Sequence, residues 1–264
     1  MAQRKSRSAA LVGVPDEAPP RLDPRIRAAL VTGSAKRNGQ ALALFLARCG
    51  VKVAIHCRAS LRAARATLAE CNRLTPGGCL VRGDLTNDRE AAAAVDDAAG
   101  KLGSLEVLVN NVGNYTRVDL FELTPAQWRD QLESNLYTSF YCMRAALPYM
   151  RRQRFGRVVN LGYAGNERPM YNRLTVPYHI AKAGLGMLTR SAAAALAQDG
   201  ITVNTLGVGI MENSVIKPVK PPAGRFARYA DLCHALAFLL NARSDHINGT
   251  QLDVSGGWIP EQIL

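Results

Sequence analysis

The stretch "AALVTGSAKRNGQALALFLA", residues 28–47, joins a short apolar run to an alanine- and leucine-rich segment through a turn that contains two glycines. The apolar run has the composition of a buried strand, and the segment after Gly39 has the apolar content of a helix. Gly33 and Gly39 allow the backbone to turn tightly and to approach another group closely. The stretch therefore predicts a strand, a tight turn and a helix, which is the first part of a β-α-β unit.

The same alternation continues along the rest of the chain. Strand-like runs occur at 28–33, 51–56, 79–84, 105–111, 157–162, 201–207 and 250–256. Helix-like segments lie between them, at 39–49, 61–75, 88–102, 124–153, 178–198 and 229–241. Apolar strands separated by helices indicate a parallel sheet that is covered on both faces. We therefore predict an α/β fold with a single Rossmann-type, doubly wound, parallel seven-stranded sheet and helices on both faces.

Composition limits the class of protein. A chain of 264 residues with 48% hydrophobic residues fits one large α/β domain, and no apolar run approaches the roughly 20 residues needed to cross a bilayer. The six cysteines are scattered, without the spacing of a metal site or a disulfide framework, so we expect no metal and a cytoplasmic location. Residues 1–26 are rich in proline and charge and are predicted to be a disordered basic tail before a domain at 27–264.

The net charge of +12 raises the question of an anionic partner. Nucleic acid is not expected, because the chain lacks an aromatic platform, a zinc module and a helix-turn-helix signal. One basic cluster stands out, formed by Arg151, Arg152, Arg154 and Arg157. It is interpreted either as a solvated face or as a landing site for an acidic carrier protein.

The turn at 32–39 fits a dinucleotide, because a helix that starts after such a turn presents free N–H groups to phosphate. An NAD site normally has a carboxylate about 20 residues further on, which holds the ribose hydroxyls. No Asp or Glu occurs between Gly33 and Glu70, whereas Arg37, Arg58 and Ser60 are available to a phosphate. We therefore predict NADP(H); the alternative is that both arginines only point into water.

The segment "PYHIAKAG", residues 177–184, places Tyr178 and Lys182 four residues apart, on one face of a helix. A free tyrosine has a pKa near 10, and a buried ammonium together with a positively charged nicotinamide close by favours the phenolate and brings that pKa toward the working range. Because the chain also has a cofactor signal, the pair is interpreted as a proton donor and its activating cation. The alternative is an ordinary pair on a helix surface.

Several motifs follow one another in a recognisable order. They are "TGSAKRNG" (32–39), Asp84, "NNVG" (110–113), Asn135 in "SNL", "YHIAK" (178–182), "VNTLGVG" (203–209) and "SGGW" (255–258). In this order and at these separations they resemble the short-chain dehydrogenase/reductase family, over residues 27–259. The resemblance implies that Tyr178 exchanges a proton with the substrate, that Lys182 binds the nicotinamide ribose and that Asn135 holds a proton-relaying water.

The same resemblance implies which residues contact the ligands. Asp84 is expected to meet the adenine, and the turn from Asn110 to Gly113 is expected to line the cofactor. The implied cofactor contacts are Gly33, Ser34, Lys36, Arg37, Asn38, Gly39, Arg58, Ser60, Asp84, Leu85, Asn111, Val112, Gly113 and Gly209. The expected substrate contacts are Tyr115 and Met211.

The chain departs from the family pattern where a serine normally binds the substrate carbonyl. Aligning the fifth strand places Tyr163 at that position, and aligning backward from Tyr178 places Gly165 there. Tyr163 either replaces the hydroxyl or forms an apolar wall. Pteridine reductases are similar in the loop arginine, Arg37, and in an aromatic residue at the place of Tyr115, but the aspartate that they carry instead of the serine is absent.

These observations predict an NADPH-dependent reductase of a 3-oxoacyl thioester, another small ketone or a pterin-like C=N group. The alternative is a catalytically weak NADP(H)-binding sensor or scaffold. Residues 211–226, with Lys217, Lys220 and Arg225, are predicted to form a mobile lid over the substrate. The family pairs subunits through the helices expected at 124–153 and 178–198, which implies a homodimer or homotetramer.

Overall fold

The structure is a computed structural model, and it describes residues 20–168, 172–214, 217 and 221–258. Seven strands form one parallel sheet in the order β3-β2-β1-β4-β5-β6-β7. Their bounds are β1 Ala28–Val31, β2 Lys52–Cys57, β3 Cys79–Arg82, β4 Val107–Asn110, β5 Gly156–Tyr163, β6 Ile201–Val208 and β7 Gln251–Val254. The predicted doubly wound α/β sheet is confirmed.

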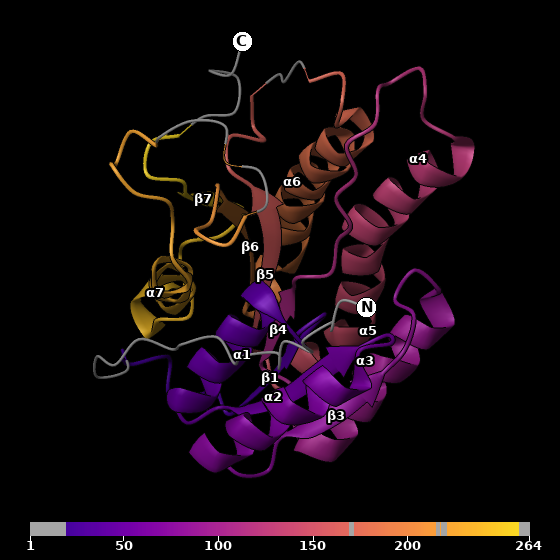
Figure 1. Ribbon diagram of the computed structural model, residues 1–264. Helices are drawn as coiled ribbons and strands as arrows, with labels where there is room; N and C mark the ends of the chain where they lie inside the picture. The colour runs from indigo at the N-terminus through magenta and orange to yellow at the C-terminus, as the bar shows by residue number, and fades with distance from the viewer. Residues whose placement is uncertain (1–19, 169–171, 215–216, 218–220, 259–264) are drawn as a thin grey trace, which may run out of the picture.

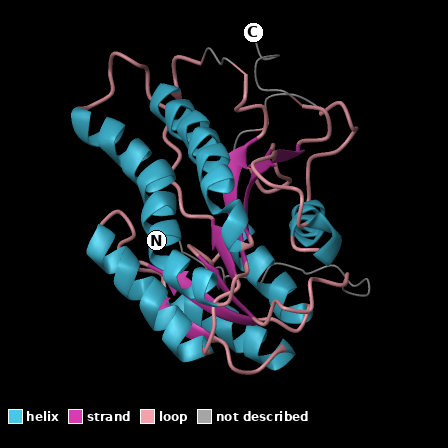
Figure 2. Cartoon of the chain, turned by 180° about the vertical axis from the view of Figure 1, so that it is seen from behind, coloured by secondary structure: helices cyan, strands magenta, loops and turns pink. Residues whose placement is uncertain are grey.

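Helices cover both faces of this sheet (Figure 1; Figure 2). They are α1 Arg37–Arg48, α2 Leu61–Leu74, α3 Asp88–Leu102, α4 Pro125–Leu132, α5 Thr138–Arg152, α6 Val176–Leu196 and α7 Tyr229–Leu239. Helix α1 packs against α2 and α7, while α3 packs against α5 on the opposite face. Within the described part of the chain, none of the helices is long and apolar enough to span a membrane.

Strand β1 shows why its residues are all apolar. Ala29 and Val31 belong to the core under α1, α2 and α7, whereas Ala28 and Leu30 belong to the core under α3, α5 and α6. Successive side chains of a strand point to opposite faces, so a strand between two helical layers needs an apolar residue at every position. The absence of polar alternation in "AALV" follows from this double burial.

The order of the strands reverses between β1 and β4, and this point is where ligands bind in open parallel sheets. The segment after β1 and the segment after β4 meet there, because both strands end at the same edge. The segments after β5 and β6 leave the same edge, beside them (Figure 1).

The helix predicted over 124–153 is interrupted. Helix α4 ends at Leu132, a π-helical turn η1 covers Glu133–Tyr137, and α5 begins at Thr138. Asn135 lies in this wide turn, and its side-chain amide donates to the Gln131 carbonyl at 3.0 Å, one turn back. Single π-helical turns inside α-helices occur frequently at functional sites, and apolar periodicity alone does not reveal them.

The predicted boundary of the N-terminal tail needs correction, because part of it belongs to the folded domain. Asp23 and Ile26 are buried, and Asp23 accepts hydrogen bonds from Arg25 and forms an ion pair with Arg157 at 3.8 Å. Residues 1–19 of the predicted tail lie outside the described part of the chain.

The predicted basic cluster also loses a member. Arg157 is buried at the start of β5, with its guanidinium 4.2 Å from the Phe155 ring centroid. Arg151 pairs with Asp199 at 2.7 Å. Arg151, Arg152 and Arg154 remain exposed, with Arg151 paired to Asp199, and the buried position of Arg157 is explained by its place in a central strand.

Replacing Asp23 by Asn should destabilise the fold, because it leaves the buried Arg157 without its carboxylate. We expect the free energy of unfolding to fall by about 3 kcal/mol in urea titrations. Arg25→Ala is the matched control, since Arg25 is an exposed partner of the same carboxylate and should change stability by less than about 1 kcal/mol. Equal losses in the two variants would show that Asp23 has no special relation to Arg157.

Candidate active site

The turn after β1 is held by close backbone packing. Gly33 has a φ of +61°, and a β-carbon there would lie 3.0 Å from Val112 Cγ2. A β-carbon on Gly39 would lie 2.6 Å from Asn111 Nδ2 and 2.7 Å from the Gly33 carbonyl oxygen. The Asn111 amide itself donates to the carbonyls of Thr32 at 2.9 Å and Gly33 at 3.2 Å. Both glycines are therefore required by the packing of this turn on the turn after β4.

The start of α1 is suited to an anion. The N-cap residue, Lys36, makes no side-chain cap and the first turn contains no acidic residue, so its N–H groups and helix dipole face outward unopposed. Arg37 has a φ of +55°, an uncommon conformation for a bulky residue. Lys36 and Arg37 are exposed and Asn38 is half-buried. These predicted contacts thus lie at the start of α1.

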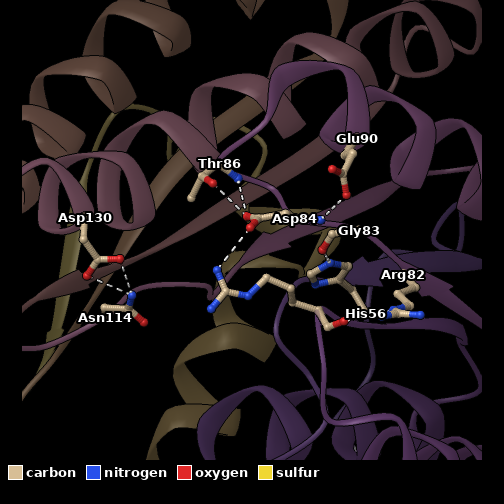
Figure 3. A network of polar contacts seen from close by, with 9 residues as sticks. His56, Arg82, Gly83, Asp84, Thr86, Glu90, Asn114 and Asp130 are labelled. Atoms are coloured by element: carbon tan, nitrogen blue, oxygen red, sulfur yellow. Dashed lines mark hydrogen bonds and ion pairs between the residues drawn. The ribbon is translucent and has the colours of Figure 1, made fainter. Parts of the chain in front are cut away.

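Arg58 and Asp84 meet beyond the ends of β2 and β3. Arg58 Nη1 donates to Asp84 Oδ2 at 3.1 Å, while Asp84 Oδ1 accepts from the backbone N and the hydroxyl of Thr86 at 3.1 and 2.8 Å. Figure 3 shows Asp84 between Thr86 and Glu90. Burial raises the pKa of Asp84, but the hydrogen bonds from Thr86 and Arg58 outweigh it and hold that pKa below its usual value. The Arg58 guanidinium is therefore held by a carboxylate at the edge of the sheet.

Three other predicted cofactor contacts, Ser34, Leu85 and Ser60, differ in how buried they are. Ser34 is buried, and its hydroxyl accepts from the backbone N of His56 at 3.0 Å, so this side chain is used within the protein. Leu85 is buried in the core, and its side chain is likewise unavailable to a ligand. Ser60 is exposed at the N-cap of α2, next to the loop that carries Arg58. Ser34, Leu85 and Ser60 remain predicted cofactor contacts, although the Ser34 hydroxyl and the Leu85 side chain are already used within the protein.

The π-helical turn directs Asn135 toward Lys182. Asn135 Nδ2 donates to the carbonyls of Asn114 at 2.8 Å and Gln131 at 3.0 Å, while its Oδ1 is buried without a hydrogen-bond partner. A β-carbon at Gly113 would collide with this Oδ1 and lie 3.6 Å from Lys182 Nζ. A buried acceptor without a partner is rare and indicates a place for a water or a ligand.

Tyr178 and Lys182 lie on the first turns of α6. Lys182 Nζ donates to the Leu161 carbonyl at 2.7 Å and lies 5.7 Å from the centroid of the Tyr178 ring. Burial raises the pKa of Tyr178, with a smaller contribution from Tyr115, and burial lowers the pKa of Lys182 to about 8. The predicted lowering of the tyrosine pKa, which includes the positive charge of a bound nicotinamide, remains a prediction; in the structure burial raises this pKa.

Aromatic rings surround the Tyr178 side chain. The exposed Tyr115 meets it edge-on with ring centroids 4.9 Å apart, and Tyr163 meets it edge-on at 5.7 Å. Trp258 lies behind Tyr163, at 6.2 Å between centroids. Tyr163, at the end of β5, thus lies beside Tyr178, whereas Gly165 lies in the turn that follows.

His179 lies inside "YHIAK", but the sequence predicts no role for it. Its ring centroid is 5.1 Å from that of Tyr163, and its Nδ1 is 3.1 Å from the Thr175 hydroxyl. Burial lowers the pKa of His179 to about 4, so the ring is neutral at neutral pH. Its ring contacts with Tyr163 and with Tyr178, whose ring centroid lies 5.5 Å away, connect it to the site.

The residues after β6 are packed tightly. A β-carbon at Gly209 would lie 2.8 Å from Ser255 Cα, and Met211 is buried and forms a β-bridge with Ala227. Met211 is thus buried in the structure, and its contact with substrate remains a prediction. The β-bridge between Met211 and Ala227 joins the two ends of the loop.

The cations of the predicted lid are largely tied down. Arg225 donates to both carboxylate oxygens of Asp231, at 2.6 and 2.8 Å, and Lys217 donates to the Glu212 carbonyl. Lys220 lies outside the described residues. Within the described part of the chain, no group of three or more His, Cys, Asp or Glu is placed to hold a metal ion.

Comparisons with known proteins match this architecture. A family profile described as Enoyl-(Acyl carrier protein) reductase matches residues 33–259. The 3-oxoacyl-[acyl-carrier-protein] reductase FabG of Staphylococcus aureus is 31% identical over 245 residues, covering 88% of this chain and 97% of that protein. The FabG of Vibrio cholerae is 32% identical over 241 residues, with 88% and 96% covered.

Solved structures agree with these relatives. A gluconate 5-dehydrogenase from Burkholderia cenocepacia, in complex with NADP and tartrate, has a TM-score of 0.81 and 29% identity, covering 90% of this chain and 96% of that one. The acetoin dehydrogenase YohF of Salmonella typhimurium has a TM-score of 0.80 and 28% identity, with 88% and 95% covered. The chain is thus an oxidoreductase that belongs to the short-chain dehydrogenase/reductase family.

Proposed function

We propose that the protein is an NADPH-dependent reductase that uses Tyr178 to protonate its substrate. The substrate is a carbonyl, as in a 3-oxoacyl thioester or another small ketone, or a pterin-like C=N group. The observation that carries this proposal is that Lys182 Nζ and the buried Oδ1 of Asn135 both lie beside Gly113, with the centroid of the Tyr178 ring 5.7 Å from Lys182 Nζ. Such a set supplies an acid, a cation and an acceptor for a water.

The protonation states favour reduction. Burial raises the pKa of Tyr178, so its hydroxyl keeps its proton until a stronger base, the developing alkoxide or amide anion, lies next to it. The ammonium of Lys182 is fixed by the Leu161 carbonyl and stabilises the phenolate once the proton has left. Asn135 Oδ1 would hold the water through which the proton returns. The nicotinamide, when bound, supplies the hydride.

The proposed preference for NADPH rests on charge at the far end of the site. Arg58 is exposed beyond β2, where it also pairs with Asp84, and the chain between Gly33 and Glu70 contributes no carboxylate of its own to repel a phosphate. The turn at Gly33 and the uncapped start of α1 would hold the diphosphate. The NADP in the gluconate 5-dehydrogenase structure is consistent with this choice but belongs to that protein.

Two observations bear on the substrate. The names of the FabG relatives favour a carrier-bound 3-oxoacyl thioester, and exposed Arg152 and Arg154 would offer an acidic carrier a basic surface. The rings of Tyr115 and Tyr163 beside Tyr178 favour a flat substrate such as a pterin. We rank a carbonyl substrate above a pterin, because this chain matches the FabG relatives over nearly their whole length.

We also propose that two copies of the chain pair through α5 and α6, as a homodimer or within a homotetramer. Large apolar side chains are exposed on η1, α5 and α6: Tyr137, Phe140, Ile180 and Met187. Apolar residues gathered on neighbouring helices favour association with another protein surface. All six cysteines are free thiols, which fits our proposal of a cytoplasmic enzyme.

Tyr178→Phe should abolish reduction while cofactor binding persists. We expect the rate of NADPH oxidation to fall by about 10²- to 10⁴-fold, the usual contribution of a general acid. The assay uses an acetoacetyl thioester, a diketone and dihydrobiopterin in parallel, and NADPH binding is followed by its fluorescence. Retained turnover would remove Tyr178 from the mechanism, and tight NADPH binding by the unaltered protein without turnover of any substrate would favour a sensor or scaffold.

Arg58→Ala should weaken NADPH binding selectively. A charged hydrogen bond contributes about 1.5–3 kcal/mol, so the Kd for NADPH should rise about 10- to 100-fold while that for NADH stays nearly constant. Arg62→Ala is a suitable control, because Arg62 is also exposed, in the first turn of α2. An equal effect of Arg58→Ala on both cofactors would contradict a phosphate contact.

The capture of NADPH should depend on the charge of Lys182. Burial lowers the pKa of this group to about 8, so the ammonium loses its proton as the pH rises through that value rather than near 10.5. We expect kcat/KM for NADPH to be level below this pH and to fall about tenfold per pH unit above it. A profile that stays level well above pH 8 would mean that the charge is not needed.

A further inference from the structure

His56, the fifth residue of β2, connects the two loops that would lie at either end of the cofactor's ADP portion. It is 2% exposed, and both ring nitrogens are engaged: Nδ1 lies 3.0 Å from the backbone N of Gly33, and Nε2 lies 3.1 Å from the Gly83 carbonyl oxygen. The labelled pair of His56 and Gly83 is visible in Figure 3, beside Asp84. One side chain thus spans from the turn after β1 to the end of β3.

The partners of His56 fix its protonation state. The backbone N–H of Gly33 can only donate and the Gly83 carbonyl can only accept, so Nδ1 is the acceptor and Nε2 carries the hydrogen. A protonated ring would place a second N–H against that of Gly33. Burial lowers the pKa of His56 and keeps the ring neutral, against smaller opposing effects of the Gly83 carbonyl and the Asp84 charge.

The backbone of His56 reinforces the connection to the first turn. Ser34 N donates to the His56 carbonyl at 3.0 Å, and His56 N donates to Ser34 Oγ at 3.0 Å. Together with the bond to Nδ1, residue 56 therefore holds two successive residues of the turn, one of which has a positive φ. On its other side, Gly83 directly precedes Asp84, the partner of Arg58.

We infer that His56 is a positioning residue for the cofactor, which sets the distance between the diphosphate turn at Gly33 and the Asp84–Arg58 pair. This inference deepens the proposed function and rests on it. His56 itself touches neither ligand nor substrate, because both of its ring nitrogens are occupied inside the protein. Its neutral imidazole can accept from the Gly33 N–H and donate to the Gly83 carbonyl at the same time. An apolar side chain of the same size can make neither hydrogen bond.

The two halves of this connection can be separated by substitution. The side-chain amide of Asn reaches the position of Nδ1 and can still accept from Gly33, whereas the longer Gln reaches the position of Nε2 and can still donate to Gly83. Phe preserves the ring shape but makes neither bond. Arg157→Met serves as a structural control, because Arg157 is buried at the opposite, amino end of the sheet.

The experiment measures the Kd for NADPH by fluorescence, kcat at saturating NADPH, and the melting temperature of each variant. We expect His56→Phe to raise Kd at least about tenfold, since it leaves a buried N–H unpaired, with kcat changed less than about twofold. His56→Gln should resemble Phe, and His56→Asn should restore most of the affinity. Arg157→Met should lower the melting temperature without raising Kd.

The outcomes separate this inference from the function on which it rests. If the unaltered protein binds NADPH and His56→Phe binds it equally well, His56 has no positioning role, although the reductase proposal stands. The same conclusion follows if the loss of NADPH affinity in the three His56 variants only tracks their loss of melting temperature. In that case Arg157→Met, which also lowers the melting temperature, should lose affinity to a similar degree. If the unaltered protein does not bind NADPH, both proposals are wrong.

Discussion

The side-chain amide of Asn111 donates to the carbonyls of Thr32 and Gly33, and these two hydrogen bonds join the ends of β1 and β4 where the strand order reverses. They satisfy backbone groups that the sheet leaves unpaired at its edge. The approach is so close that Gly39 has no space for a side chain. From Asn111 the chain reaches Gly113, which lies against Asn135 and Lys182, so the same contact places the phosphate end and the proton-transfer end of the site relative to each other.

At the proton-transfer end, burial opposes charge on both partners. It raises the pKa of Tyr178, to which Tyr115 adds, and it lowers that of Lys182, whose Nζ donates to the Leu161 carbonyl. The raised pKa keeps the Tyr178 phenol protonated, and Lys182 Nζ, which donates to the Leu161 carbonyl, lies 5.7 Å from the centroid of its ring. Aromatic rings flank the phenol, and a charge that develops beside apolar rings interacts more strongly than it would in bulk water.

The sequence predicts the sheet well, because "AALV" and similar runs are apolar at every position and only double burial explains that pattern. It also predicts which residues converge, since Tyr178 and Lys182 share a helical face and Gly33 marks the turn. It does not predict effects of tertiary structure. Arg157 looks like part of a surface cluster until its strand is placed at the centre of the sheet beside Asp23. Likewise, nothing in "VKVAIH" distinguishes His56 from an ordinary core residue, because its partners are backbone atoms of two distant loops.

The π-helical turn has a geometric consequence for the rod formed by α4 and α5. One extra residue in a helix of 3.6 residues per turn rotates everything that follows by about 100° around the axis. The face that α4 turns toward α6 is therefore out of phase with the face that α5 turns toward α3 and β4. One continuous pair of helices can in this way pack against neighbours that lie in different directions. Asn135 lies in the π-helical turn between them, so its side chain points in a direction that neither α-helix alone would give it.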